Sequence, residues 1–144
     1  MTRELPASLL MFIASRAAVD RIFAAVQDAG FTDATIAQGR LMMNIDPEGT
    51  RLSVLAERAL IAKQTATALV DRLERAGYVE RVPDPSDGRA RLVRMTARAE
   101  SVLPIARAEE ARIEAEWRAH LGDERMDQLR QALTALRTIT DPYN

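Results

Sequence analysis

Apolar side chains recur every three or four positions along most of the chain, which is the periodicity of an amphipathic helix. The pattern predicts a first helix over residues 6–29, with Pro6 at its start and Gly30 just after its end. A second helix is predicted over about 33–45, before the turn-forming segment DPEG. The N-terminal third of the chain is therefore expected to be helical.

Two shorter helices are predicted next, over residues 53–59 and 63–76. Only residues 60–62 separate them, and Gly77 is typical of the position just after a helix end. Two short helices with separate apolar faces and a tight link predict a helix-turn-helix. The second helix has its apolar face at the spacing i, i+3, i+4, i+7, formed by Ala66, Leu69, Val70 and Leu73.

The following segment changes to strand character. β-Branched and aromatic residues predict a strand over 78–82, which Pro83 is expected to end. A returning strand is predicted over 91–95, and the loop between the strands contains the turn pair Asp87-Gly88. A β-hairpin directly after a helix-turn-helix predicts a winged helix-turn-helix.

Two longer helices are expected to complete the chain. Thr96 should cap a helix over about 97–119, which Pro104 should kink or delay. Gly122 should break this helix, and Asp123 is expected to cap the last one. The last helix carries a narrow apolar seam that requires a partner helix, formed by Met126, Leu129, Leu133 and Leu136.

Length and hydropathy limit the organisation of the protein. A chain of 144 residues has the size of a single domain, so we expect one domain over 1–144, mainly α with a small β-hairpin. No apolar run approaches the ~20 residues of a membrane span. Charged residues interrupt the first 23 positions, which argues against a signal peptide and favours a cytoplasmic location.

Metal, cofactor and enzyme chemistry find little support in the sequence. There is no cysteine, and the only histidine, His120, is expected to lie exposed at a helix end, so neither a metal nor another cofactor is expected. No catalytic constellation is recognisable. The acids at 109, 110, 114 and 116 are interpreted as a solvated helix face, and the sequence argues against an enzyme.

Charge is distributed unevenly along the chain. Residues 51–98 contain ten basic and six acidic residues, a net charge of +4, although the whole chain carries −1 and its two ends together therefore carry −5. A basic centre between acidic ends is typical of a protein that binds a polyanion through its middle.

Four motifs of this centre occur together: LAER at 55–58, TALVDRLE at 67–74, GYVER at 77–81 and DPSDGRARLV at 84–93, closed by Met95-Thr96. In combination they resemble the helix-turn-helix and wing of the multiple antibiotic resistance regulator (MarR) family of bacterial transcription factors. The pattern departs from the family at Ala62, where a capping serine is common.

The resemblance implies a homodimer that binds a pseudo-palindromic operator in double-stranded DNA. Residues 51–96, the winged lobe, would bind the DNA. The first and last helices, over 5–30 and 97–140, would form the dimer interface, with Leu9, Ile13, Leu129, Leu133 and Leu136.

The resemblance also implies a small-molecule effector, because such ligands often weaken DNA binding in this family. A pocket for it would lie between the dimerisation helices and the winged lobe. Arg16, Met42 and Met43 are candidate lining residues, and a plain core position is the more ordinary interpretation for the two methionines.

The exposed side of the second short helix is the candidate base-reading surface, because recognition helices read bases with their N-terminal residues. Gln64 can pair bidentately with adenine, and Thr65 can bond to a base edge or touch a thymine methyl. Ala68 offers only apolar contact. The alternative for Gln64 and Thr65 is ordinary solvated helix surface. The candidate phosphate contacts are Lys63, Thr67 and Arg72.

Arg89 at the hairpin tip is the candidate minor-groove contact, because narrow A·T-rich grooves concentrate negative potential. Arg91 and Arg94 lie on opposite faces of the strand, and Arg91, nearer the tip, is the better candidate for a phosphate contact. In the resemblance Asp87 braces the wing arginine through an ion pair; the plainer interpretation is a turn-forming residue. Asp71 is interpreted as structural, and it would either pair with Arg75 or lie beyond the groove.

Two functions are compatible with this pattern. The first is a sequence-specific DNA-binding transcriptional regulator, most readily a ligand-responsive repressor. The second is a winged-helix protein-interaction module without sequence-specific DNA binding. The basic centre and Arg89 favour the regulator.

Overall fold

The structure is a computed structural model that describes residues 3–142. Contacts divide it into two units, Met1–Ala106 and Arg107–Asn144, and each is described by itself. The sequence-based expectation of one domain over 1–144 stays a prediction. Within the described residues, no helix combines the length and the apolar character needed to span a bilayer.

The first unit begins with α1 (Ala7–Asp28), which confirms the predicted first helix. α2 (Ile36–Met42) is shorter than the predicted 33–45. Its start is fixed by a capping box, in which Thr35 Oγ1 accepts from the Gln38 amide and Gln38 Oε1 accepts from the Thr35 amide. The capping residue leaves the helical conformation, so residues 33–35 stay outside the helix.

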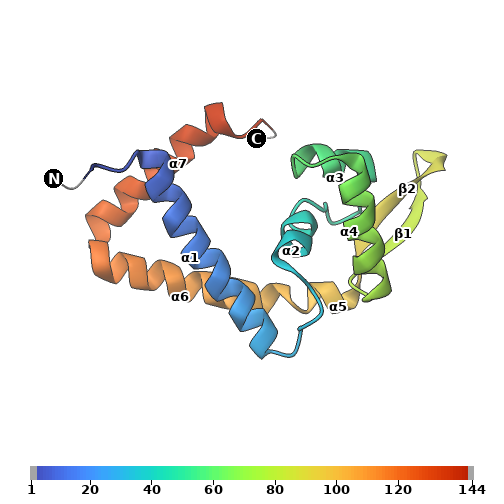
Figure 1. The fold of residues 1–144 in the computed structure, drawn as a ribbon, viewed down its shortest axis with the longest axis horizontal. Helices are drawn as coiled ribbons and strands as arrows, with labels where there is room; N and C mark the ends of the chain where they lie inside the picture. Colours follow the sequence, from blue (N-terminus) through green and yellow to red (C-terminus); the bar gives the residue numbers. More distant parts are fainter. Residues whose placement is uncertain (1–2, 143–144) are drawn as a thin grey trace. The chain divides into compact units, whose positions relative to one another are not determined.

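The helix-turn-helix consists of α3 (Leu52–Arg58) and α4 (Lys63–Arg75), as predicted to within one residue (Figure 1). Ala66, Val70 and Leu73 of α4 have no exposed surface, whereas Leu69 is half-buried. They pack in one apolar cluster with residues of α2, α3 and the hairpin, among them Leu41, Leu55, Tyr78, Val79 and Val93. This cluster is the core of the first unit.

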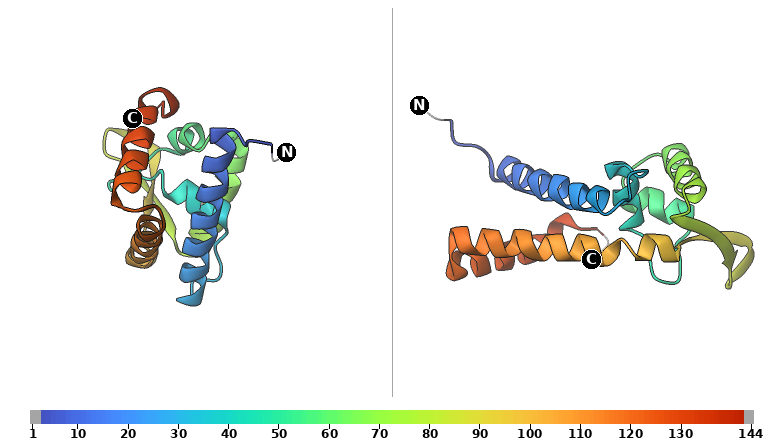
Figure 2. Two further views of the ribbon diagram at one scale, coloured as in Figure 1. Left: turned by 90° about the vertical axis from the view of Figure 1, so that its left-hand side faces the viewer. Right: turned by 90° about the horizontal axis from the view of Figure 1, so that it is seen from below.

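The hairpin of β1 (Val79–Asp84) and β2 (Asp87–Met95) extends away from α4 (Figure 2). It is longer than predicted, because the turn is Pro85-Ser86 and not Asp87-Gly88. The Asp84 carboxylate fixes this turn by accepting from the Ser86 amide at 2.9 Å. Pro83 does not end β1: it pairs with Arg91 beside a register shift, where a proline is tolerated in a two-stranded sheet.

A bridge from the loop before α3 joins the hairpin to the helix-turn-helix. Thr50 and Val93 exchange two backbone hydrogen bonds, at 2.9 and 2.8 Å. Gly49 makes the approach possible, because it has φ +107° and a Cβ there would lie 2.9 Å from Leu92 Cβ. The bridge therefore depends on a glycine at this position.

The predicted long helix over 97–119 is divided into α5 (Ala97–Glu100) and α6 (Leu103–Leu121). Thr96 caps α5 as predicted, by accepting from the Ala99 amide. The interruption follows from Pro104, which lacks the amide hydrogen that would continue the helical ladder.

The second unit contains most of α6 and α7 (Asp123–Thr140), packed around Ile113 and Met126. The prediction that Asp123 caps α7 was wrong, because Gly122 occupies the N-cap position with φ +87°. Asp123 is instead the first helical residue and forms an ion pair with Arg118 at 3.3 Å.

Gly49→Ala is expected to lower the free energy of unfolding by about 1–3 kcal/mol, because alanine is strained at positive φ and its methyl group would crowd Leu92. Chemical denaturation measures the change. Gly39→Ala is the matched control: a Cβ there meets no atom within 4 Å, and replacing a helical glycine should stabilise by about 0.5–1 kcal/mol. Equal effects of the two substitutions would contradict the assigned role of Gly49.

Candidate nucleic-acid interface

One side of α4 is exposed along its N-terminal half. The core residues Ala66, Val70 and Leu73 fix the rotation of the helix, and the opposite side faces solvent. The predicted contacts Lys63, Gln64, Thr65, Ala68 and Arg72 are all exposed, and Thr67 is half-buried.

The start of α4 carries no side-chain cap, because Ala62 occupies the N-cap position. The hydroxyl of Thr67 turns back into the helix and donates to the Lys63 carbonyl oxygen at 2.9 Å. The free backbone N–H groups of the first turn and the exposed Lys63 therefore make this end of α4 the positive end.

Asp71 has a structural partner other than the predicted Arg75. Its carboxylate accepts from Arg81 of β1 at 2.7 Å, and Glu74 accepts from the same guanidinium at 2.9 Å. This ion pair ties α4 to β1. The structural interpretation of Asp71 is confirmed, and the suggested pairing with Arg75 was wrong because the carboxylate bonds to Arg81 instead.

The arginines of β2 divide into paired and unpaired groups. Arg94 bonds to Glu80 across the hairpin, with Nη2 to Oε1 at 2.6 Å. Arg89 and Arg91 are exposed, and neither has a carboxylate partner within residues 3–142. Of the two arginines on opposite faces of β2, the one left available is Arg91.

Asp87 contacts Arg89 through the backbone. Its Oδ1 accepts from the Arg89 amide at 3.0 Å, while Oδ2 lies 3.9 Å from Arg51 Nη2. The carboxylate thus shapes the chain at Arg89 and pairs with Arg51, where the resemblance implied an ion pair with the Arg89 guanidinium. Its role as a brace in DNA binding stays a prediction.

Arg51 and Asp84 form an ion pair that sequence reasoning missed. Arg51 Nε and Nη2 both lie 2.8 Å from Asp84 Oδ2. Hydrogen bonds from Ser86, followed by the Arg51 guanidinium, hold the pKa of the largely buried Asp84 below its usual range. The only local signal was an arginine in the N-cap position of α3, where a short polar side chain is usual.

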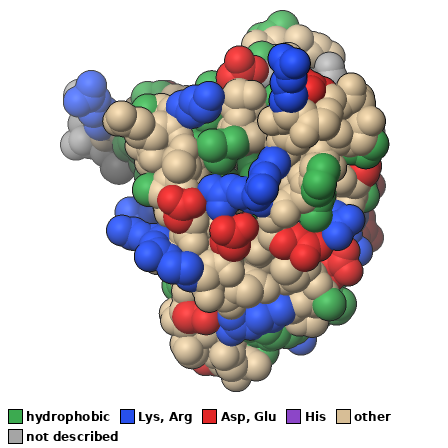
Figure 3. Space-filling model, turned by 90° about the vertical axis from the view of Figure 1, so that its right-hand side faces the viewer, with side chains coloured by type: hydrophobic (Ala, Val, Ile, Leu, Met, Phe, Trp, Pro, Cys, Tyr) green, Lys and Arg blue, Asp and Glu red, His purple; other side chains and the backbone are tan. Residues whose placement is uncertain are grey.

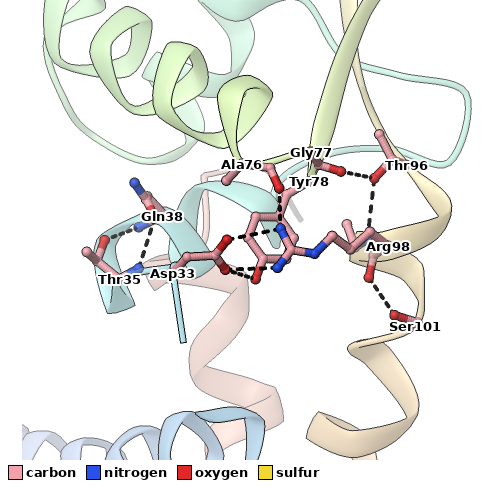
Figure 4. Close-up of polar contacts among 10 residues, drawn as sticks. Asp33, Thr35, Gln38, Ala76, Gly77, Tyr78, Thr96, Arg98 and Ser101 are labelled. Atoms are coloured by element: carbon pink, nitrogen blue, oxygen red, sulfur yellow. Dashed lines mark hydrogen bonds and ion pairs between the residues drawn. The ribbon is translucent and has the colours of Figure 1, made fainter. Parts of the chain in front are cut away.

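A second cluster holds the junction of α4 and β1 (Figure 4). The Arg98 guanidinium lies over the ring of Tyr78, 4.2 Å from its centroid, and forms a fork of two 3.1 Å bonds to Asp33. It also donates to the Ala76 carbonyl oxygen. The Tyr78 hydroxyl donates to Asp33 Oδ1 at 2.5 Å. The cluster joins the segment before α2 to α5 through the hairpin base.

The hydrogen bond between Tyr78 and Asp33 shifts the pKa values of both residues. The hydrogen bond from Tyr78, and then those from Arg98, hold the pKa of Asp33 below its ordinary value. Burial, helped by the Asp33 carboxylate, raises the pKa of Tyr78 to about 12. At neutral pH the phenol is therefore a permanent donor and Asp33 a permanent acceptor.

The predicted dimerisation residues lie apart from the cores of both units. In α1, Leu9 is 41% and Ile13 51% exposed, and none of the residues of α1 is buried. In α7, Leu129 is half-buried, Leu133 is 40% exposed and Leu136 is 38% exposed.

The candidate effector residues are not brought together. Arg16 lines a shallow groove of about 280 Å³ along α1 with Phe12, Ile13, Ala17 and Asp20, and neither methionine lines that groove. Met42 packs against the core, which confirms the plainer interpretation for this residue. That interpretation was wrong for Met43, whose surface is 82% exposed because it lies at the end of α2.

The face that carries the hairpin and α4 has basic side chains interspersed with acidic ones (Figure 3). The acids of α4 and the hairpin are held in the ion pairs described above, and they are Asp71, Glu74, Glu80, Asp84 and Asp87. Among residues 3–142, no group of three histidine, aspartate or glutamate side chains is arranged to hold a metal ion. Within the described chain, the charged side chains of α4 and the hairpin that form no ion pair are therefore all cationic.

Two short helices, α3 and α4, are followed by a projecting hairpin, and the Thr50–Val93 bridge joins the loop before α3 to that hairpin. This arrangement defines a winged helix-turn-helix protein. The family model described as "MarR family" matches residues 29–90. The crystal structure titled "Crystal Structure of MarR" superposes with a TM-score of 0.71 at 26% identity and covers 93% of this chain and 96% of that one. The chain is therefore similar to the MarR family over the matched segment, and its fold is similar to that of MarR.

Two further relatives carry informative names. The transcriptional activatory protein BadR of Rhodopseudomonas palustris is 33% identical over 65% of this chain and 52% of its own length. The S. aureus MepR–DNA complex has a TM-score of 0.67 at 20% identity and covers 94% of this chain and 98% of that one. The chain spans about half the length of the curated relatives that it matches.

Tyr78→Phe is expected to change how stability depends on pH. Because the pKa of Tyr78 is raised from 10.0 to about 12, the phenol contributes stability that is fully present below pH 10 and lost as the pH rises toward 12. The melting temperature of the wild type should fall over this pH interval more steeply than that of the variant. The other tyrosine, Tyr143, lies outside the described residues and is common to both proteins; parallel curves would contradict the assigned pairing.

Proposed function

We propose that the protein is a sequence-specific DNA-binding transcriptional regulator that binds a pseudo-palindromic operator as a homodimer. The observation that carries the proposal is the pair of exposed, unpaired arginines, Arg89 and Arg91, on a hairpin that projects beside the exposed side of α4. A helix and a projecting hairpin suit the major groove and the adjacent minor groove of one duplex.

The contacts divide by chemistry. Gln64, Thr65 and Ala68 lie exposed near the start of α4 and would read base edges in the major groove. Arg89 would enter the minor groove. The groups that would contact phosphates and fix the register without reading sequence are Lys63, Thr67, Arg72 and Arg91.

Dimerisation follows from apolar side chains that the single chain leaves exposed. Leu9 and Ile13 of α1, and Leu133 and Leu136 of α7, recur at helical spacing on surfaces that lie outside both cores. Helices with such stripes are stable in water when a second helix covers them. A second copy of the chain would supply that cover and would place two winged lobes on one operator.

The direction and control of regulation are part of the proposal. We propose repression that a small-molecule effector relieves, with Arg16 and the groove of α1 as the candidate contact for an effector. One relative is named an activator, so measurement of transcription from the bound promoter decides the direction. Met42 and Met43 are secondary candidates, because Met42 is a core residue and Met43 lies in solvent.

Binding to promoter DNA upstream of its own or a neighbouring gene should weaken steeply with salt. Each winged lobe has three proposed cationic phosphate contacts, which are Lys63, Arg72 and Arg91. A dimer would therefore have six, and the slope of log affinity against log salt concentration should be about −5. Gel shifts between 50 and 200 mM salt measure it. The absence of any shift on these promoters, with a soluble folded protein, would favour the protein-interaction module instead.

Arg89→Ala is expected to weaken operator binding by about 1–3 kcal/mol, because it removes a groove contact. Arg94→Ala is the matched control: it removes the same charge from the same strand, but Arg94 is already engaged by Glu80. Titration of a labelled duplex compares the two. Equal losses would mean that Arg89 acts only through net charge.

A further inference from the structure

We propose that Arg51 is a positioning residue, which holds the hairpin tip at a fixed angle to the helix-turn-helix so that Arg89 can reach the minor groove. The proposal rests on the DNA-binding function proposed above. It concerns a residue that lies at the start of α3, outside both the base-reading side of α4 and the wing.

The first contact of Arg51 reaches the turn of the hairpin. Two nitrogens of its guanidinium lie 2.8 Å from Asp84 Oδ2. The other oxygen of Asp84 accepts from both the amide and the hydroxyl of Ser86, at 2.9 and 2.7 Å. One carboxylate therefore bonds to α3 through one oxygen and to the turn through the other. We call Arg51 with its two aspartates, Asp84 and Asp87, the wing tie.

The second contact reaches Arg89 itself. Arg51 Nη2 lies 3.9 Å from Asp87 Oδ2, and Asp87 Oδ1 accepts from the Arg89 amide. The Asp87 carboxylate thus links Arg51 to the backbone of Arg89, the proposed groove-contacting arginine. A shift of Arg51 would be transmitted to Arg89 without any change in the Arg89 side chain.

The position of Arg51 is itself fixed. The preceding residue, Thr50, exchanges two backbone hydrogen bonds with Val93, and Gly49 lies against Leu92. These contacts hold the base of the hairpin. Beyond them, β1 and β2 form only a two-stranded ribbon, which twists easily and is weakly stable by itself. The wing tie supplies the outer point of attachment that such a ribbon needs.

A direct phosphate contact by Arg51, whose side chain is 43% exposed, predicts different behaviour. Asp84→Asn removes a negative charge and releases Arg51. If Arg51 bound phosphate, this change would strengthen DNA binding or leave it unaltered. If Arg51 positions the wing, the same change weakens binding even though the protein becomes more positive.

The binding experiment uses a duplex that the wild-type protein selects from a random pool. Arg51→Ala and Asp84→Asn are each expected to weaken binding by about fivefold or more, within the range of losing a DNA contact. Both should also reduce the preference for A·T over G·C pairs beneath the wing, and Arg51→Ala should add little to Arg89→Ala. A loss with Arg51→Ala together with unchanged or tighter binding by Asp84→Asn would overturn the proposal.

Matched controls come from the Glu80–Arg94 ion pair, which lies within the hairpin. Arg94→Ala and Glu80→Gln change the charge by the same amounts as Arg51→Ala and Asp84→Asn, but their pair joins the two strands of the hairpin to each other and not to α3. They should leave the A·T preference intact. An equal loss of preference in these variants would assign the effect to charge and overturn the proposal.

A measurement without DNA tests the tie independently. The chain has no cysteine, so Glu57→Cys and Gly88→Cys introduce unique labelling sites on α3 and at the tip. Both positions are exposed, and a Cβ at Gly88 meets no atom within 4 Å. The distribution of distances between spin labels should be narrow in the parent protein and broader after Arg51→Ala. An unchanged width would overturn the proposal even if the protein binds DNA.

The two measurements separate this proposal from the proposed function. If the parent protein selects no duplex, the DNA-binding function fails, and the label distances still decide whether Arg51 holds the tip. If the parent selects a duplex and Arg51→Ala binds it with the same affinity and base preference, the function stands and the positioning role is overturned.

Discussion

Burial of one side of α4 is the interaction on which the rest of the winged lobe depends. Val70 and Leu73 are fully enclosed, and burial of such side chains contributes about 1.5–3 kcal/mol each. Because this burial fixes the rotation of the helix, it also turns Gln64 toward solvent. The same cluster includes Tyr78 and Val93, so the hairpin starts from the core that orients the helix. The positions of the candidate base-reading side and of the wing therefore have one common origin.

Acidic residues decide which arginines remain available. Residues 51–98 carry a modest net positive charge, but their arginines fall into two groups. Acidic residues form ion pairs with some of the guanidinium groups and leave the others exposed to solvent. Arg81 and Arg94 are engaged within or beside the hairpin, and Arg98 at its base. Arg89 and Arg91 are left at the end that projects. Net charge was a weak guide to this surface because the pairing, which depends on the fold, sets the local charge.

Sequence periodicity predicted the helices and the hairpin because each depends on neighbours within a few residues, as the apolar spacing of α4 illustrates. It misplaced the turn, because Asp87-Gly88 is a good turn signal but the Asp84 carboxylate satisfies Ser86 and closes the chain earlier. It missed the pairing of Arg51 with Asp84, which lie 33 positions apart, and that of Asp33 with Arg98, which lie 65 apart. No local pattern encodes such partners, since they meet only after the core has formed.

The Glu80–Arg94 pair has an evolutionary consequence. Loss of the carboxylate would release a guanidinium at the surface of the hairpin without disturbing the core or any candidate base-reading side chain. Substitutions at acidic residues that never touch a ligand could thus adjust the attraction of the winged lobe for a polyanion in single-charge steps. Relatives with the same recognition side chains could diverge in how tightly they hold the same sequence, and selection could tune occupancy separately from specificity.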